Sequence, residues 1–322
     1  MIAGRRLGET SDGGELLIFN KMPAYCLKHG ERVGDGIKRI VREEIAAAVG
    51  YLNGEGAGGS DEAIHEARKS VKKIRGALRL VQPEMGKIYA IENRFFRDIG
   101  RQLSTFRDAT ASVETFDELR KKYRGDLDGR MLAAMRRRLT ARKVQAEKEA
   151  GIGEVLKTVT AALEGAAARV DGWPLSKDGF AAIAPGLEAT FRRGSKALAR
   201  AQKHPRAENY HDWRKRVKEQ WYHIRLLEGL RNPEMQASER ELKDLEEALG
   251  ADHNLVVLRE RMVGEPAYYA SKAEVRRVVR AMDAYRKELS DEAFRLGERI
   301  YAESPGHFTR RVGRLWEAGS WA

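Results

Sequence analysis

The sequence predicts an all-α protein made of two pseudo-symmetric, antiparallel helical bundles. Three observations lead to this fold class. Residues that favour helices are abundant, no stretch keeps the alternating pattern of a β-strand, and one basic segment recurs later in the chain. With 322 residues, the chain is long enough to bury a large core, either as two domains or as one duplicated domain.

The recurring segment is HEARKSVKKIRGALRLV at residues 65–81, which aligns with HDWRKRVKEQWYHIRLL at residues 211–227. Seven of the 17 positions are identical at a fixed offset of 146 residues. A match of this kind indicates an internal duplication. We therefore expect a first repeat over about residues 24–150 and a second over about residues 151–318.

Helical periodicity predicts the elements in order. In the first repeat we expect helices over residues 31–52, 61–82, 86–120 and 128–150. In the second we expect helices over residues 152–170, 178–203, 208–231, 235–262 and 268–301, followed by a short helix over 305–318. Breaks rich in glycine or proline, such as QPEMG (82–86) and NPEM (232–235), separate them.

Two segments outside the helices need their own interpretation. GEGAGG at residues 54–59 matches a dinucleotide-binding pattern in its letters. That site requires a preceding strand, whereas a helix precedes the segment here, so we expect a loop. Residues 1–23 show no periodicity and are expected to form a flexible arm.

The charge balance points to a polyanionic partner. The chain has 60 Lys and Arg against 48 Asp and Glu, a formal net charge of +12. Such an excess favours nucleic acid, anionic lipid or a phosphate polymer. Aromatic residues are 7% of the chain, which is few for a protein that stacks bases along a groove. Nucleic acid is therefore the weaker of the polymer candidates.

Cysteine use and hydropathy set the expected compartment. Cys26 is the only cysteine, so an intrachain disulfide is excluded and a reducing compartment is indicated. No apolar run approaches the roughly 18 residues of a membrane span. We expect a cytoplasmic protein without a membrane partner.

The basic segments become amphipathic when they are placed on helices at 100° per residue. The first cationic face, which covers roughly 120° of arc, consists of His65, Arg68, Lys69, Lys72, Arg75 and Arg79. The opposite face consists of Ala67, Val71, Ile74, Leu78 and Val81. The second cationic face consists of His211, Arg214, Lys215, Lys218, Tyr222 and Arg225, opposite Trp213, Val217, Ile224 and Leu227. Each helix is thus expected to pack through its apolar face and present cations on the other.

The two cationic faces predict an anion-binding site. A face that is merely solvated usually contains Asp or Glu at i+4 spacing, which relieves repulsion; these faces are almost purely cationic. Arg forks and Lys ammonium groups suit a polymer that offers only oxygen acceptors. Further candidates upstream of the repeats and at equivalent positions are Arg192, Arg193 and Lys196, and with less support Lys38, Arg42, Arg107 and His253.

The two histidines fit a phosphate-contacting role better than a metal site. Neither His65 nor His211 has a second His, Cys or carboxylate at metal-ligand spacing, so we expect no metal and no cofactor. Both lie on the cationic faces. Their protonation on mild acidification is expected to strengthen phosphate binding. Asp108, late in a predicted helix, is expected to hold a cationic side chain in place.

The chain resembles the CHAD family, the "conserved histidine α-helical domain", over about residues 24–318. The resemblance rests on the order and spacing of AYCLKHGERVGDGIKRI (24–40), HEARKSVKKIR (65–75), LSTFRDAT (103–110), HDWRKRVKEQWY (211–222), LGADHNLVVL (249–258) and LGERIYAESPGHF (296–308). It implies two helical bundles whose His-bearing helices line a central basic cavity. It also implies binding of inorganic polyphosphate and association with polyphosphate granules.

Two features limit what the resemblance carries over. Some relatives have an N-terminal triphosphate tunnel domain, for which residues 1–23 are too short, so we expect a stand-alone domain without that enzymatic activity. Trp221 stands where the family has Arg, and Asn254 where Asp is usual.

Three function classes remain open at this point. A non-catalytic polyphosphate-binding module is the leading interpretation. Nucleic-acid binding is allowed by the charge, although no recognition signature supports it. A phosphohydrolase or phosphohistidine enzyme would need a carboxylate cluster or a general base beside the phosphate, which the cationic faces do not offer.

Overall fold

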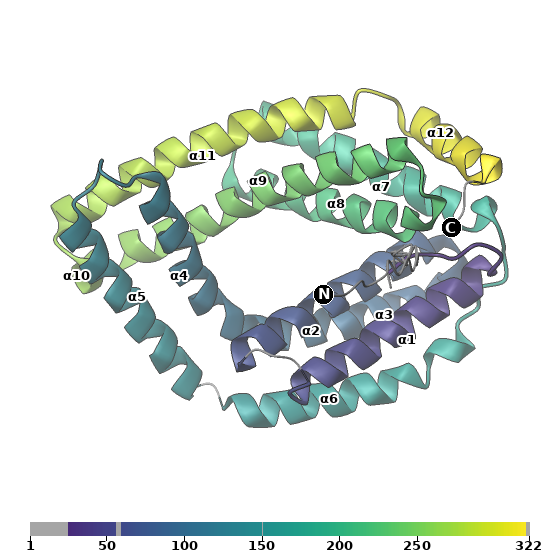
Figure 1. Ribbon diagram of the computed structural model, residues 1–322, viewed down its shortest axis with the longest axis horizontal. Helices are drawn as coiled ribbons and strands as arrows, with labels where there is room; N and C mark the ends of the chain where they lie inside the picture. The colour runs from purple at the N-terminus through teal and green to yellow at the C-terminus, as the bar shows by residue number, and fades with distance from the viewer. Residues whose placement is uncertain (1–24, 56–58, 150, 320–322) are drawn as a thin grey trace, which may run out of the picture.

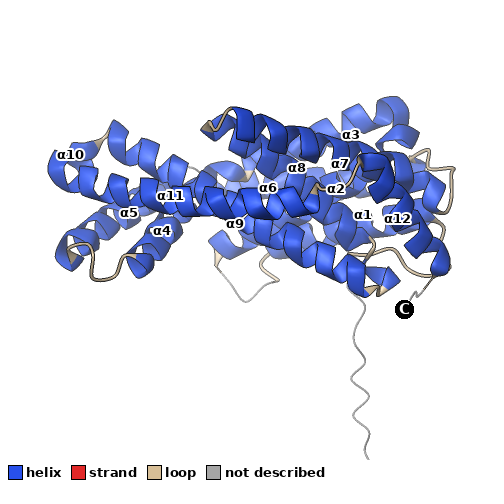
Figure 2. Cartoon of the chain, turned by 90° about the horizontal axis from the view of Figure 1, so that it is seen from above, coloured by secondary structure: helices blue, strands red, loops and turns tan. Residues whose placement is uncertain are grey.

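A computed structural model describes residues 25–55, 59–149 and 151–319, apart from the side chains of residues 105–108, 147 and 149. In this part of the chain the fold is all-α, with no β-strand (Figures 1 and 2). The predicted fold class is therefore confirmed. The expected arm at residues 1–23 lies outside the described residues.

The described residues form twelve α-helices and two short 3-10 turns. In chain order these are α1 (Val33–Leu52), α2 (Ser60–Leu80), α3 (Gln82–Gln102), α4 (Ser104–Lys122), α5 (Gly129–Glu149), α6 (Ile152–Ala167), η1 (Val170–Gly172), α7 (Phe180–Lys203), α8 (Ala207–Leu226), η2 (Glu228–Leu230), α9 (Pro233–Gly264), α10 (Pro266–Tyr269), α11 (Lys272–Ile300) and α12 (Pro305–Ala318).

Side chains cap the helices where the breaks were expected. The Asn232 side chain accepts hydrogen bonds from the backbone N–H groups of Glu234 and Met235 at the start of α9. Ser271 and Glu274 form a reciprocal capping box at the start of α11. Pro233 occupies the first turn of α9, where its missing N–H costs nothing. These local signals explain why both helices begin within a few residues of their predicted positions.

Two long predicted helices are interrupted. The helix expected over residues 86–120 is divided between α3 and α4 at Leu103. There the Ser104 hydroxyl donates a hydrogen bond to the Gly100 carbonyl, 2.7 Å away, an interaction that bends helices. Gly86, in the predicted QPEMG break, has a φ of 50° and kinks α3 near its start. The helix expected over residues 268–301 is divided into α10 and α11.

The helices of the two halves meet through α2 and α8. In the first half α1 packs on α2, and in the second α7 packs on α8. α2 and α8 contact each other in the middle of the molecule, while α6 lies along α1 and α12 lies along α7 (Figure 1). The α4–α5 hairpin, α10 and part of α11 form an end that extends away from the remaining helices (Figure 2).

Corresponding helices follow the same order in each half. α1 and α7 begin 147 residues apart (180 − 33), and so do α2 and α8 (207 − 60). This spacing agrees with the 146-residue offset of the sequence repeat. The duplication itself stays a prediction from the sequence.

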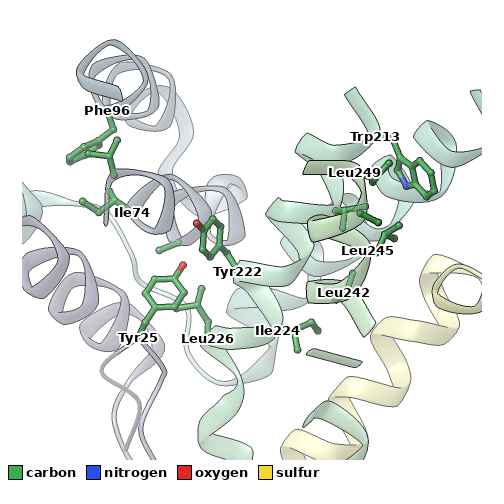
Figure 3. Packing of buried hydrophobic residues seen from close by; sticks show 14 of the residues in the cluster. Tyr25, Ile74, Phe96, Trp213, Tyr222, Ile224, Leu226, Leu242, Leu245 and Leu249 are labelled. Atoms are coloured by element: carbon green, nitrogen blue, oxygen red, sulfur yellow. The ribbon is translucent and has the colours of Figure 1, made fainter. Parts of the chain in front are cut away.

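The apolar faces of α2 and α8 are buried as predicted. Ala67, Val71 and Ile74 of α2 and Trp213 and Val217 of α8 are at most 1% exposed. Where the two helices cross, Tyr222 and Tyr25 point toward each other with ring centroids 6.0 Å apart (Figure 3). The core therefore fixes which face of each helix remains for other contacts.

The segment before α1 ties the two halves together. Tyr25 Oη donates a hydrogen bond to the Lys73 carbonyl of α2, at 2.9 Å. The Leu27 amide donates to the Leu226 carbonyl of α8, also at 2.9 Å. Among the described residues, no helix is long and apolar enough to cross a membrane.

Candidate anion-binding site

Residues of both cationic faces line one cavity of about 190 Å³ where α2 passes α8. Six of the predicted binding residues contribute to it. From the first face these are Lys72, Arg75 and Arg79, and from the second Lys215, Lys218 and Tyr222. Gly76 and Glu219 complete the lining. Five cationic side chains therefore surround the cavity, against one carboxylate.

Glu219 of α8 holds the Arg side chains on one side of this cavity. Its carboxylate lies 2.8 Å from Arg79 Nη1, and both side chains are nearly buried, at 11% and 12% exposure. Arg193 of α7 lies 3.9 Å from the same carboxylate, which brings this predicted residue beside the cavity. A buried carboxylate between two guanidinium groups orients both of them. Glu219 thus links α2, α7 and α8.

A second carboxylate, Glu246 of α9, pairs with the second cationic face. It lies 2.8 Å from Lys218 Nζ and 3.2 Å from Arg214. We expected both faces to be almost purely cationic, and the structure corrects this for each: Arg79 of the first face pairs with Glu219, and Lys218 and Arg214 of the second pair with Glu246. The difference arises because a helical wheel shows the residues of one helix only, whereas each of these carboxylates comes from a neighbouring helix.

Lys72 has no such partner. Among the residues that the structure describes, no carboxylate lies within ion-pair distance of its half-buried ammonium group. Burial, and after it the positive charges of Lys218, Arg68 and Arg214, together lower the pKa of Lys72 to about 7, against the opposing effect of Glu246. The charged form of Lys72 is therefore held at a cost that a bound anion would relieve.

Arg75 lies beside Lys72 on α2 and is oriented by a neutral group. Its Nε donates a hydrogen bond to the Asn93 side-chain oxygen of α3, at 3.1 Å. Burial lowers the Arg75 pKa, and the charge of Arg79 acts in the same direction. Because an Arg remains protonated at any physiological pH, this shift reports crowding of positive charge at the cavity.

The outer ends of both faces carry paired lysines. Lys69 lies 2.8 Å from Glu66, and Lys215 lies 3.3 Å from Asp212. Both lysines are about half exposed. His65 Nε2 is 4.0 Å from Glu66, at the same end of α2. These exposed pairs contribute little to stability, so an incoming polyanion can compete for the lysines.

His211 and His253 form a stacked pair, with ring centroids 4.3 Å apart. Burial lowers the pKa of His253 to about 4, helped by His211, Arg214 and Lys215. Burial likewise lowers the pKa of His211, as do Lys215 and Arg214. We expected His211 to charge on mild acidification. The lowered pKa of His211 agrees with the expectation that neighbouring Lys and Arg disfavour its charged form in the free protein; the effect of a bound polyanion on it stays a prediction.

A family model described as the CHAD domain matches residues 39–263, more than two thirds of the chain. The chain belongs to the CHAD domain family. No curated protein matches the sequence significantly.

Two solved structures share the fold of this CHAD domain. The crystal structure of the CHAD domain from the plant Ricinus communis is 19% identical, and the match covers 87% of this chain and 95% of that chain with a TM-score of 0.55. PptA from Streptomyces chartreusis is 15% identical, and the match covers 85% of this chain and 100% of that chain with a TM-score of 0.58. At these identities the likeness concerns the fold.

Several predicted residues of this CHAD domain have other contacts. Lys38 donates to the Asp171 carbonyl at 2.9 Å, and Arg42 pairs with the Asp171 carboxylate, so both tie α1 to η1. Arg192 pairs with Glu188 within α7, and Lys196 is exposed on the same helix. The structure does not place these four among the cavity-lining residues.

Arg225 is also held away from the cavity lining. Its guanidinium lies 5.1 Å from the Trp221 ring and 5.6 Å from the Tyr25 ring, and it pairs with Glu228 at 3.3 Å. Trp221, which stands where an Arg was expected, stacks on this guanidinium. The side chains of Arg107 and Asp108 lie outside the described residues.

Sequence reasoning missed His223. This residue is fully buried in α8, and its Nε2 lies 3.1 Å from the Gly76 carbonyl of α2. Because a carbonyl can only accept, Nε2 carries the proton. Burial lowers the His223 pKa to about 3. The available signal in the sequence was its place next to the apolar residues Ile224, Leu226 and Leu227, whereas the repeat pointed to His211.

Further hollows lie elsewhere in the described part of the chain. One of about 450 Å³, at the α4–α5 turn, is lined by Asp117, Arg120, Lys121 and Arg124 with smaller residues. Another of about 100 Å³, between α8, α9, α11 and α12, contains Arg299 and Arg311, which pair with Glu241 and Glu303. Within the same described ranges, no cluster of three His, Cys, Asp or Glu could hold a metal ion.

Proposed function

We propose that this protein binds inorganic polyphosphate without catalysis, through the cavity that the two cationic faces share. The observation that carries the proposal is the convergence of five Lys and Arg side chains, from two distant segments, on one cavity with a single lining carboxylate. The family to which the chain belongs supports the same ligand, since the sequence resemblance implies it. Association with polyphosphate granules in the cytoplasm is part of the proposal.

The chemistry of the cavity suits a phosphate polymer better than a nucleic acid. Polyphosphate offers only charged oxygen acceptors, which the Arg75 and Arg79 guanidinium groups and the Lys72 and Lys218 ammonium groups can satisfy. Tyr222 is the only aromatic residue in the lining, and it is 4% exposed. A base therefore finds little surface on which to stack.

Lys72 is expected to couple binding to proton uptake. A bound phosphate favours its ammonium form and so raises a pKa that the free protein holds at about 7. Binding then takes up a proton near neutral pH. Affinity should accordingly rise as the pH falls from about 8 to about 6.

The carboxylates near the cavity support a binding role over hydrolysis. Glu219 and Glu246 are both engaged by Arg or Lys at 2.8 Å. A carboxylate held in this way is a poor general base, because its lone pairs accept hydrogen bonds from cations. A phosphohydrolase or phosphohistidine activity would appear as released phosphate or an acid-labile phosphoryl label, and we expect neither.

The binding test is a titration with long-chain polyphosphate at several salt concentrations. If about six phosphates are neutralised, log Kd should change with log salt with a slope of magnitude about 4, from roughly 0.7 per contact in a flexible strand. Single-stranded DNA at equal phosphate concentration is the competitor. A slope near zero, or displacement of polyphosphate by DNA at equal phosphate, would contradict the proposal.

A further inference from the structure

Lys72 differs in its surroundings from the other lysine of the cavity. Lys218 lies 2.8 Å from the Glu246 carboxylate, which stabilises its ammonium form. Lys72 lines the same cavity without a carboxylate partner in the described ranges, and Arg75 of α2 and Lys218 of α8 belong to the same lining. The cavity leaves the amine accessible to a small molecule, and the surrounding cations attract an anionic one.

The groups around Lys72 favour its neutral amine. Arg68 on its own helix and Lys218 and Arg214 on α8 repel the ammonium form, and Glu246 on α9 is already paired with both α8 cations. Burial acts in the same direction, and the resulting pKa is about 7. The neutral amine is therefore far more populated near neutral pH at Lys72 than at an ordinary lysine, whose pKa is about 10.4. A neutral amine is a nucleophile, whereas an ammonium group is not.

We propose that Lys72 is a site of acylation by small acyl phosphates, which the cationic cavity recruits through their phosphate group. This inference rests on the proposed function only in requiring that the cavity attract phosphate. It adds a covalent modification to the site and names the residue that takes it.

The chemistry balances without a further reactant. The Lys72 amine attacks the carbonyl carbon, an N–C bond forms, and the C–O bond to phosphate breaks. The nitrogen loses one proton and the leaving group departs as hydrogen phosphate, so acetyl phosphate and amine yield acetamide and hydrogen phosphate. The neighbouring cations stabilise the charge on the departing phosphate.

Acylation would change the charge of the cavity for as long as the amide persists. The amide carries no charge and can no longer act as a three-fold donor. It would also relieve the repulsion between Lys72 and the α8 cations. We expect acylated protein to bind polyphosphate less tightly, so that the level of acyl phosphate sets the fraction of protein that can bind.

The test uses the full chain and acetyl phosphate at pH 7, with site occupancy followed by mass spectrometry. Lys72 should be acetylated at least about tenfold faster than exposed Lys196 and faster than paired Lys218, since the gain in neutral amine exceeds the loss of intrinsic nucleophilicity. Long-chain polyphosphate should protect it. Equal rates at Lys72 and Lys196 would overturn the inference.

Two controls separate recruitment from simple reactivity. The neutral donor p-nitrophenyl acetate should show a weaker preference for Lys72 than acetyl phosphate; an equal preference would refute recruitment through phosphate. The Lys72→Arg variant keeps the charge, should keep its helical circular dichroism and should lack the fast site. If Lys72 reacts fast while polyphosphate does not bind, the proposed function fails and the acylation site stands.

Discussion

The side chain of His223 joins the two halves through one hydrogen bond. It reaches from α8 to the Gly76 carbonyl of α2, beside the cavity that Gly76 helps to line. Its Nδ1 has no partner among the described residues, so the ring gains nothing from a second proton. The burial that lowers its pKa also makes the residue sensitive to acid.

Replacing His223 should change how stability depends on pH. The folded-state pKa is about 3, and an unfolded histidine has a pKa of about 6.5. Between these values the unfolded chain binds more protons, so the free energy of unfolding falls as the pH falls, by up to about 1.4 kcal/mol per pH unit. The contribution is complete above about pH 6.5 and is lost toward pH 3.

Urea denaturation of the parent and the His223→Gln variant between pH 7 and pH 4 measures this effect. The variant should lose less stability on acidification than the parent. The exposed histidine in His204→Gln provides the control, which should follow the parent curve. Parallel curves for the parent and His223→Gln would show that the buried imidazole is protonated without penalty.

At the level of the helices, glycine decides how closely α2 approaches its neighbours. A Cβ atom at Gly76 would lie 2.9 Å from Tyr222 Cβ and 3.1 Å from Tyr25 Oη. At Gly186 of α7 it would lie 1.9 Å from the Leu80 carbonyl oxygen. Contacts this short require the helices to separate. The close approach of α2 to α8 and to α7 therefore depends on two positions without side chains.

The Gly76→Ala variant should test the close packing of α2 and α8. It is expected to lower the free energy of unfolding by about 1–3 kcal/mol, because the new methyl group overpacks a tight crossing. The matched control is Gly165→Ala in α6, where nothing lies within 4 Å of the added Cβ. This change should raise the free energy of unfolding by about 0.5–1 kcal/mol. Equal effects of the two substitutions would contradict the packing.

At the scale of the whole molecule, one cavity joins residues that lie about 140 positions apart in the sequence. Neither half supplies the site alone. Glu219 of the second half holds Arg79 of the first, so the halves also orient each other's cations. A ligand in the cavity would contact both, and removing charge from one half should affect the contribution of the other.

Charge-removing variants in each half test the shared site. Lys72→Met with Arg75→Met, and separately Lys215→Met with Lys218→Met, should each raise the Kd for polyphosphate at least about tenfold, or about 1.4 kcal/mol. Their combination should nearly abolish binding. Lys121→Met with Arg124→Met, at the α4–α5 turn, removes the same charge and should change Kd less than about threefold. Equal losses in all three double variants would indicate a general charge effect and no shared cavity.

The sequence by itself determined the helical class, most helix ends and the buried faces of α2 and α8. These features follow from periodicity and capping, which act over a few residues. Ile74 and Trp213 are buried where the wheel placed them, and six of the predicted binding residues line the cavity. The break at Leu103 was missed because a single hydroxyl bond to the preceding turn has no periodic signature.

Only the tertiary structure decided which cations are neutralised. Glu246 reaches the second cationic face from α9, and Glu219 pairs with an Arg of the other half. The unpartnered Lys72, the lowered pKa of His211 and the buried His223 follow from the same packing. Electrostatic energy depends on distance and burial in space, and the approach of two helices far apart in the chain sets both.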